Sequence, residues 1–208
     1  MSEKEAIPLP ELQHDRLNLA VVDLETASLS SHRFVVCVGI KPLDGDPYYI
    51  GIDNVKRCKD KHRIDTEVVR EAKRHLEHYD GWVWWNGDRF DKPFLNDRLQ
   101  MCGLEMLEQR FQWDLMKDFK WPKSRTASIS LKNVSGQFGC PYRKVEMNIL
   151  DHEKARNEAI VMSATDKWLL GKEYYQMLVD HCVEDLKMTQ WMISIAKPRK
   201  RILSKNCA

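Results

Sequence analysis

Two acidic residues near the start of the chain are placed where they could share a divalent cation. Asp23 and Glu25 lie two residues apart, directly after the apolar run of residues 17–22. The run reads as a β-strand, and the period-2 geometry of a strand puts both carboxylates on one face, about 6.5–7 Å apart along the chain. Carboxylates at a strand end are costly unless they are solvated or bind cations. The pair therefore indicates either a solvated loop or a cation site.

Two further segments carry acidic side chains beside helices. Asp91 ends the segment Asn86-Gly-Asp-Arg-Phe-Asp and precedes a helix, so it could be a helix N-cap or a ligand. His181 and Asp185 are four residues apart in the C-terminal helix and so face the same way. That spacing is compatible with a surface ion pair or with a site.

Taken together, the four acidic residues predict a specific chemistry. Side chains that offer only oxygen suit Mg²⁺ or Mn²⁺ rather than metals that prefer sulfur or imidazole. Two such ions about 3.5–4 Å apart stabilise the attacking and leaving oxygens of a phosphoryl transfer. We therefore expect a nuclease site with two Mg²⁺ or Mn²⁺ ions, formed by Asp23, Glu25, Asp91 and Asp185.

The hydrophobic pattern predicts the elements that must position these residues. Runs rich in β-branched and aromatic residues predict five strands, at residues 17–22, 33–40, 48–52, 81–86 and 112–116. Helical spacing and helix-ending residues predict helices at residues 65–79, 93–102, 128–136 and 172–196, with Asp65 or Thr66 as the first N-cap and Gly103 closing the second helix. An antiparallel meander followed by βαβ units indicates one α/β domain over residues 1–196, with a mixed five-stranded sheet flanked by helices.

Composition limits the classes of function. The chain has 208 residues, 43% hydrophobic and 31% charged, as in globular proteins. Residues 197–208 carry five bases and no acid, which leaves 28 Lys and Arg against 31 Asp and Glu elsewhere. A body that is not basic overall must bind a polyanion through local patches or bound cations. The six cysteines form no Cys-x-x-Cys pair, so reduced thiols are expected.

The sequence shows neither a signal peptide nor a membrane-spanning segment, and residues 197–201 resemble a nuclear-localisation or nucleic-acid-binding patch that does not decide the compartment. Residues 1–10 contain acids where a signal peptide has a basic region, and no stretch approaches eighteen consecutive apolar residues. We therefore expect a soluble, intracellular, cytoplasmic protein with no membrane partner.

Three motifs resemble those of a known superfamily. Asp23-Leu24-Glu25-Thr26, the segment from Asn86 to Phe90-Asp91-Lys-Pro-Phe-Leu, and His181-Cys-Val-Glu-Asp185 occur in the order and spacing of the DEDD superfamily of 3′–5′ exonucleases. Residues 130–139 also resemble the helix that these enzymes place between the second and third motifs. The resemblance covers residues 17–192 and is greatest to the proofreading exonuclease domain of family B DNA polymerases, whose fold is ribonuclease H-like.

The resemblance implies a role for each motif residue. Asp23, Glu25, Asp91 and Asp185 would be the metal ligands. The substrate would be the 3′ end of single-stranded or frayed DNA, with a separate polymerase or repair assembly as a candidate partner. The alternatives are an exoribonuclease of the same fold and a catalytically silent nucleic-acid-binding module. The substrate-binding residues implied are Leu24, Thr26, Asn86 and Phe90.

His181 departs from the superfamily pattern. The superfamily has either a Tyr four residues before the last Asp or a His five residues before it, whereas His181 lies four before Asp185. An imidazole could accept a proton from the attacking water, orient that water, or simply pack against neighbouring side chains. If it is the base, we expect its pKa to lie near neutrality, with an upward shift if the surrounding carboxylates stabilise the charged ring.

Three further segments are weaker candidates for nucleic-acid contact. Residues 56–63 carry five bases and one acid, and the basic tail of residues 197–208 could add substrate affinity. Of Trp82, Trp84 and Trp85, most should lie in the core, with at most one available to stack on a base.

Overall fold

The structure is a computed structural model, and it describes residues 17–27, 34–56, 58, 60, 63–119, 129–164 and 173–196. Its elements occur along the chain in the order βββαβαβ, followed by a 3₁₀ turn and three helices. The strands are β1 (Leu19–Thr26), β2 (Val35–Pro42), β3 (Tyr48–Gly51), β4 (Gly81–Trp84) and β5 (Phe111–Asp114). The helices are α1 (Thr66–Leu76), α2 (Asp91–Met101), η1 (Leu115–Asp118), α3 (Leu131–Gln137), α4 (Ile149–Ala164) and α5 (Glu173–Ile195).

The five strands form one mixed sheet in the order β3-β2-β1-β4-β5. β1, β2 and β3 pair antiparallel, whereas β4 runs parallel to β1 and β5 runs parallel to β4. The expected meander and βαβ units are therefore confirmed. β1 is the central strand, and most of its side chains are buried because helices cover both faces of the sheet, with Asp23, Glu25 and Thr26 partly buried at its end.

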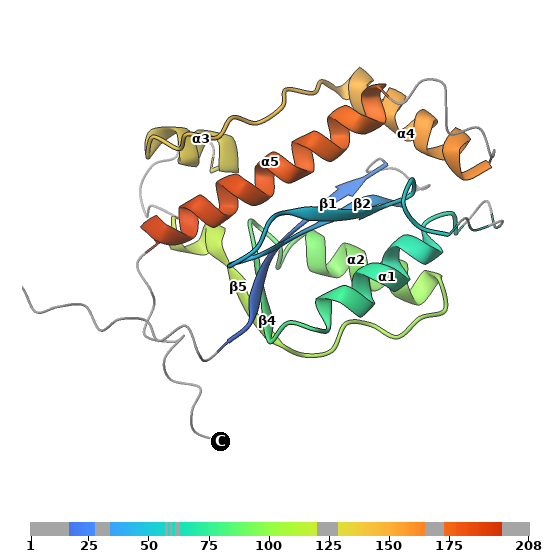
Figure 1. Ribbon diagram of the computed structural model, residues 1–208, viewed down its shortest axis with the longest axis horizontal. Helices are drawn as coiled ribbons and strands as arrows, with labels where there is room; N and C mark the ends of the chain where they lie inside the picture. Colours follow the sequence, from blue (N-terminus) through green and yellow to red (C-terminus); the bar gives the residue numbers. More distant parts are fainter. Residues whose placement is uncertain are drawn as a thin grey trace, which may run out of the picture.

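The helices lie in two layers on either side of the sheet. α5 crosses one face, with α3 and α4 beside it, and α1 and α2 cover the other face (Figure 1). Leu19 and Val21 of β1 pack in one core cluster with Leu186 and Met192 of α5. Because alternate residues of a strand point to the same face, Asp23 and Glu25 continue this α5-facing row. The strand pattern thus determines which helix the acids meet.

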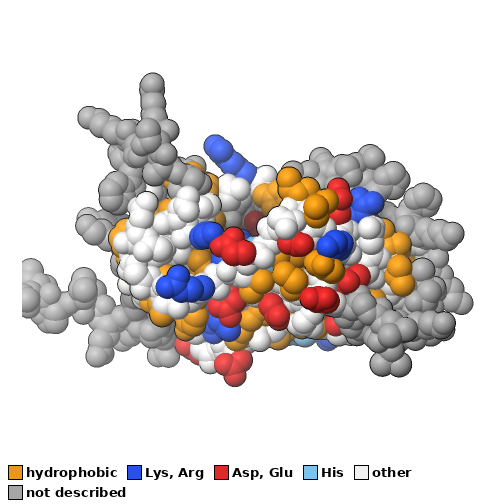
Figure 2. Space-filling model, turned by 90° about the horizontal axis from the view of Figure 1, so that it is seen from above, with side chains coloured by type: hydrophobic (Ala, Val, Ile, Leu, Met, Phe, Trp, Pro, Cys, Tyr) orange, Lys and Arg blue, Asp and Glu red, His pale blue; other side chains and the backbone are white. Residues whose placement is uncertain are grey.

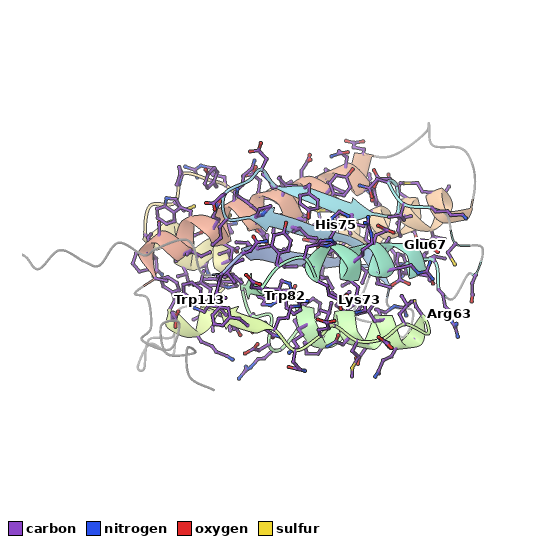
Figure 3. All side chains as sticks on the ribbon, turned by 60° about the horizontal axis from the view of Figure 1, so that its bottom comes forward. Arg63, Glu67, Lys73, His75, Trp82 and Trp113 are labelled. Carbon is purple, nitrogen blue, oxygen red and sulfur yellow. The ribbon has the colours of Figure 1, made fainter. Side chains whose placement is uncertain are left out.

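The tryptophans behave largely as expected. Trp82 and Trp84 are fully buried with ring centroids 6.2 Å apart, whereas Trp85 is half-buried. The Trp82 indole N–H donates to the carbonyl of Leu76 at the end of α1, and in Figure 3 Trp82 lies to the left of Lys73 and His75 of α1. Trp82 and Trp84 are therefore core residues.

Some local expectations are wrong or incomplete. Asp65 precedes α1 but makes no side-chain cap. Its carboxylate instead accepts hydrogen bonds from the Val35 N–H and from Arg98. These partners are distant in sequence, and they occupy the oxygens that a helix cap would use. α4 was not predicted, because its apolar residues do not gather on one helical face. Gly103 ends α2 with φ 73°, as expected of a helix-closing glycine.

Two of the basic segments expected to contact nucleic acid lie wholly or partly outside the residues that the structure describes. The tail of residues 197–208 and much of the basic segment 56–63 lie outside the described residues. Five cysteines are described, and all are free thiols. Among the described residues, no helix is long and apolar enough to cross a membrane.

Candidate active site

The first two acids lie within β1 rather than after it. Asp23 pairs with Gly39 of β2 and Glu25 pairs with Cys37. The register shifts between Glu25 and Thr26, so a bulge follows the acidic pair directly. The strand therefore holds both carboxylates rigidly in the central position of the sheet, under α5.

Asp91 reaches the same place from the neighbouring strand. β4 runs parallel to β1, so the loop that leaves β4 emerges at the same sheet edge as the end of β1. Asp91 is the first residue of α2 and is only 5% exposed. Its Oδ1 accepts a hydrogen bond of 3.2 Å from the backbone N–H of Leu24, the residue between Asp23 and Glu25. This bond ties the second motif to the first.

Asp185 arrives from the opposite end of the chain, on α5. The helix lies close to β2 at Gly39, where a β-carbon would be only 2.5 Å from Sγ of Cys182 and 2.8 Å from Cδ1 of Leu186. Gly39 pairs with Asp23, so this close approach brings α5 to the level of Asp23. His181 and Asp185 lie on the same helix face, as their spacing predicts.

The pKa values of Asp23, Glu25 and Asp91 are raised by burial and by neighbouring carboxylates. Burial, followed by the charge of Asp185, raises the pKa of Asp23 to about 7. Burial and then Asp23 raise the pKa values of both Glu25 and Asp91 well above their usual range. Acids far apart in sequence are thus brought into one electrostatic cluster.

Lys144 lies in this cluster, and the sequence did not indicate it. Its ammonium forms an ion pair with Oδ2 of Asp185. Burial lowers the pKa of Lys144, but Asp185, Asp23 and Glu25 outweigh that effect and raise it. Lys144 belongs to the irregular segment before α4, where no periodicity or motif spacing marked it. A basic residue in a long irregular segment was the only signal available.

Two buried carboxylate oxygens in the cluster lack hydrogen-bond donors. Oδ2 of Asp23 and Oδ1 of Asp185 are shielded from solvent and accept no hydrogen bond from the described part of the chain. A buried carboxylate without a donor is costly unless a cation compensates it. Oxygen-only donors of this kind fit Mg²⁺ or Mn²⁺.

The ligands are nevertheless not arranged around one ion position. Within the described ranges, no group of three or more His, Cys, Asp or Glu side chains surrounds a single point. The partners of Asp185 and Asp91 give a reason, because Lys144 and the Leu24 N–H already engage one oxygen of each. Cation binding would require Lys144 to withdraw from Asp185 or the carboxylates to rotate.

His181 points one ring nitrogen into the cluster. Its Nδ1 lies 2.6 Å from the carbonyl oxygen of Val145, and its Nε2 lies 3.9 Å from Oε1 of Glu25 and 4.0 Å from Oδ2 of Asp185. A carbonyl only accepts, so Nδ1 carries the hydrogen and Nε2 of the neutral ring is an acceptor. Burial, followed by the charge of Lys144, lowers the pKa of His181. The expected upward shift is therefore wrong, because burial and Lys144 outweigh the carboxylates.

The four residues expected to bind substrate differ in burial and in backbone conformation. Leu24 is buried and Thr26 is half-buried at the end of β1. Phe90 packs against Phe94 with ring centroids 5.7 Å apart and keeps partial exposure. Asn86 is half-buried and has φ 68°, which is the only left-handed backbone conformation of a non-glycine residue in the described chain.

The surface on the α5 side is not uniformly basic. Figure 2, which views this side, shows acidic and basic side chains intermixed with apolar ones. These mixed charges agree with the composition of the chain, which is not basic overall outside residues 197–208.

Comparisons with known proteins agree with this architecture. The family model described as RNase H superfamily matches residues 20–194. Among solved structures, the family B DNA polymerase from the hyperthermophilic archaeon Pyrobaculum calidifontis is similar, with a TM-score of 0.59 and 17% sequence identity. The similarity covers 92% of this chain and 25% of that polymerase chain, so this chain spans about a quarter of it. A search of curated proteins found no match. The expected ribonuclease H-like α/β fold is confirmed.

Proposed function

The chain belongs to the RNase H superfamily, and from that membership we propose that it is a metal-dependent 3′–5′ exonuclease. The observation that carries the proposal is the pair of buried oxygens, Oδ2 of Asp23 and Oδ1 of Asp185, that accept no hydrogen bond from the described residues. They come from the central strand and from the terminal helix, within a cluster of four acids. Such a cluster is expensive to fold and is explained by cation binding.

The roles of the acidic residues follow from their positions. Asp23, Glu25, Asp91 and Asp185 would hold two Mg²⁺ or Mn²⁺ ions. The bound ions would supply activation of a water and stabilisation of the charge on the scissile phosphate. Burial of the carboxylates under α5 limits water around the reacting group and strengthens each electrostatic contact there.

His181 and Lys144 supply the remaining polar groups. Nε2 of His181 is an acceptor in the neutral ring and faces the cluster, so it can take a proton from the attacking water. The hydrogen bond from Nδ1 to the Val145 carbonyl fixes the ring orientation and the tautomer. Lys144 compensates Asp185 before the substrate and ions arrive.

We propose the 3′ end of single-stranded or frayed DNA as the substrate, with RNA as the alternative. Asn86 and Phe90 would line the path of the terminal nucleotides, and Leu24 and Thr26 would border the terminal base. A separate polymerase or repair assembly is the proposed partner. The likeness of the fold to a family B DNA polymerase supports this choice of nucleic acid.

One assay tests the proposal. Purified protein is incubated with end-labelled DNA and RNA oligonucleotides, each as single strand and duplex, with Mg²⁺, Mn²⁺ or a chelator. We expect stepwise shortening from the 3′ end of single-stranded DNA, and loss of activity in the chelator and in Asp23→Ala and Asp185→Asn. Asp97→Asn is the matched control, because Asp97 is an exposed aspartate of α2. Cleavage that persists in the chelator would refute the metal-dependent mechanism.

A further inference from the structure

Asp114, at the end of β5, is a buried acid that the proposed chemistry does not use. Its side chain is 1% exposed, and its Oδ2 accepts no hydrogen bond within the described part of the chain. The nearest cation that faces it is Lys117, with Nζ 3.9 Å from Oδ2. Lys117 also forms an ion pair with Asp88 in the loop before α2. A buried carboxylate with so little compensation costs stability, so its position calls for another explanation.

One hydrogen bond that Asp114 accepts comes from the loop that carries Asn86. β5 pairs with β4 so that Asp114 lies beside Trp84, two residues before Asn86. Oδ1 of Asp114 accepts the backbone N–H of Asn86 at 3.0 Å. A carboxylate that accepts a backbone N–H forms a charge-assisted bond, which is stronger than a neutral one.

Asn86 needs this support because its backbone is strained. A non-glycine residue with φ 68° is in a sparsely populated region, and Asn tolerates it better than most residues. The Asn86 carbonyl accepts the N–H groups of Arg89 and Phe90 at 3.1 and 3.2 Å. The next residue is also confined, because a β-carbon on Gly87 would lie 2.2 Å from Cβ of Trp84. The loop thus turns tightly at Asn86, and Asp114 anchors the turn from outside.

We propose that Asp114 is a positioning residue that holds Asn86 in the left-handed conformation needed to direct its side chain at the 3′-terminal nucleotides. The inference rests on the proposed function, since it assigns Asn86 to the substrate path. Asp114 would set substrate affinity through Asn86 without touching the substrate or the metal ions. No other described residue accepts a hydrogen bond from the Asn86 N–H.

A rival role for Asp114 is electrostatic. Burial and Asp23 are the main causes of the raised pKa of Asp91, and Asp114 adds a smaller contribution. Asp114→Asn separates the two roles, because the amide keeps an oxygen that can accept the Asn86 N–H but removes the charge. Asp114→Ala removes both.

The kinetic test combines these variants with Asn86→Gly, which keeps the turn unstrained but removes the side chain. On single-stranded DNA we expect Asp114→Ala to raise KM about 10-fold, with a much smaller change in kcat, and Asp114→Asn to stay close to wild type. Asn86→Gly should raise KM to a similar extent, and the double variant Asp114→Ala/Asn86→Gly should be no worse than Asn86→Gly alone. Additive effects on KM, or an equal fall of kcat in Asp114→Ala and Asp114→Asn, would overturn the proposal.

A second measurement separates this inference from the nuclease proposal. Amide hydrogen exchange of Asn86 is followed in the free protein, together with anisotropy of a labelled single-stranded oligodeoxynucleotide in chelator. Exchange should be slow in wild type and Asp114→Asn and fast in Asp114→Ala, and only Asp114→Ala should bind the oligonucleotide more weakly. If no variant cleaves DNA but exchange and binding change in this way, the nuclease proposal fails and the positioning role stands. Unchanged exchange in a folded Asp114→Ala protein would refute the positioning role by itself.

Discussion

Gly39 of β2 lies directly opposite Asp23 of β1, and the missing side chain of Gly39 is what lets α5 approach Asp23. A β-carbon at Gly39 would be 2.5 Å from Sγ of Cys182. Cys182 is three residues before Asp185, and its Sγ lies 3.9 Å from the carbonyl oxygen of Asp23. The separation between the acids of the first and third motifs is therefore set by a residue that carries no chemistry of its own.

The first prediction concerns this contact. Gly39→Ala should push α5 away from β1, because neither the Sγ of Cys182 nor Leu186 can yield fully in a packed core. We expect a loss of about 1–3 kcal/mol in the free energy of unfolding, measured by urea titration, and at least a 10-fold fall in nuclease rate. Cys182→Ala in the Gly39→Ala background removes the Sγ atom nearest to the added β-carbon. It should therefore restore part of the stability and part of the nuclease rate. A Gly39→Ala protein with normal rate would show that this approach does not position Asp185.

The second prediction concerns pH and stability without metal ions. The folded-state pKa of Asp23 is about 7, above the ordinary value of 3.8, so the folded protein holds a proton that the unfolded chain releases. The contribution of Asp23 to the free energy of unfolding is therefore most favourable below pH 4, and it becomes less favourable as the pH rises toward 7. Each pKa unit corresponds to about 1.4 kcal/mol, so the fall should amount to a few kcal/mol.

Thermal melts in chelator from pH 5 to pH 8 would measure this fall. Asp23→Asn should melt higher than wild type at pH 8 and show a flatter profile, since it removes the buried charge. Added Mg²⁺ should likewise make the melting temperature of the wild-type protein less dependent on pH. A wild-type melting temperature in chelator that rises between pH 5 and pH 8 would contradict the burial of Asp23 in this cluster.

The third prediction concerns Lys144. Lys144→Met removes the cation that pairs with Asp185, so at pH 8 the metal-free variant should lose on the order of 2 kcal/mol of stability. Mg²⁺ should recover most of the loss if the ions bind beside Asp185. Lys132→Met is the matched control, because Lys132 pairs with Glu146 at the surface and is 53% exposed. Equal destabilisation by the two variants would mean that Lys144 is an ordinary surface lysine.

The fourth prediction concerns His181. The single-turnover rate should fall at acid pH with a midpoint below 6.5, because burial and Lys144 lower the pKa of the imidazole. His181→Ala should remove this limb and cost about 100-fold in rate, whereas His78→Ala, at an exposed position in the turn after α1, should leave the rate unchanged. His181→Tyr should retain substantial activity without the acid limb, because a hydroxyl would orient the water. An Ala variant with an unaltered rate and pH profile would reduce His181 to a packing residue.

Local patterns were enough to predict the framework of the site. Strand alternation placed Asp23 and Glu25 on one face, and helical spacing placed His181 on the face of Asp185. Both periodicities are properties of the backbone itself and need no tertiary information. The meander and the βαβ units followed from the same patterns and predicted an α/β domain with a mixed sheet, whereas the ribonuclease H-like fold was expected from the resemblance of the three motifs to the DEDD superfamily.

Contacts between segments that are distant in sequence determine the partners and the charge states of the site residues. Lys144 meets Asp185 across 41 residues and Asp114 meets Asn86 across 28, and no periodicity links such positions. The direction of the pKa shift of His181 was predicted wrongly because it depends on burial and on Lys144, which only the packed chain brings together. Likewise, the Asp65 carboxylate does not cap α1 but accepts hydrogen bonds from Arg98 and from the Val35 N–H. The sequence by itself determined which acids share a strand or helix face, whereas desolvation and long-range pairing, which exist only in the folded chain, decided their charge states and partners.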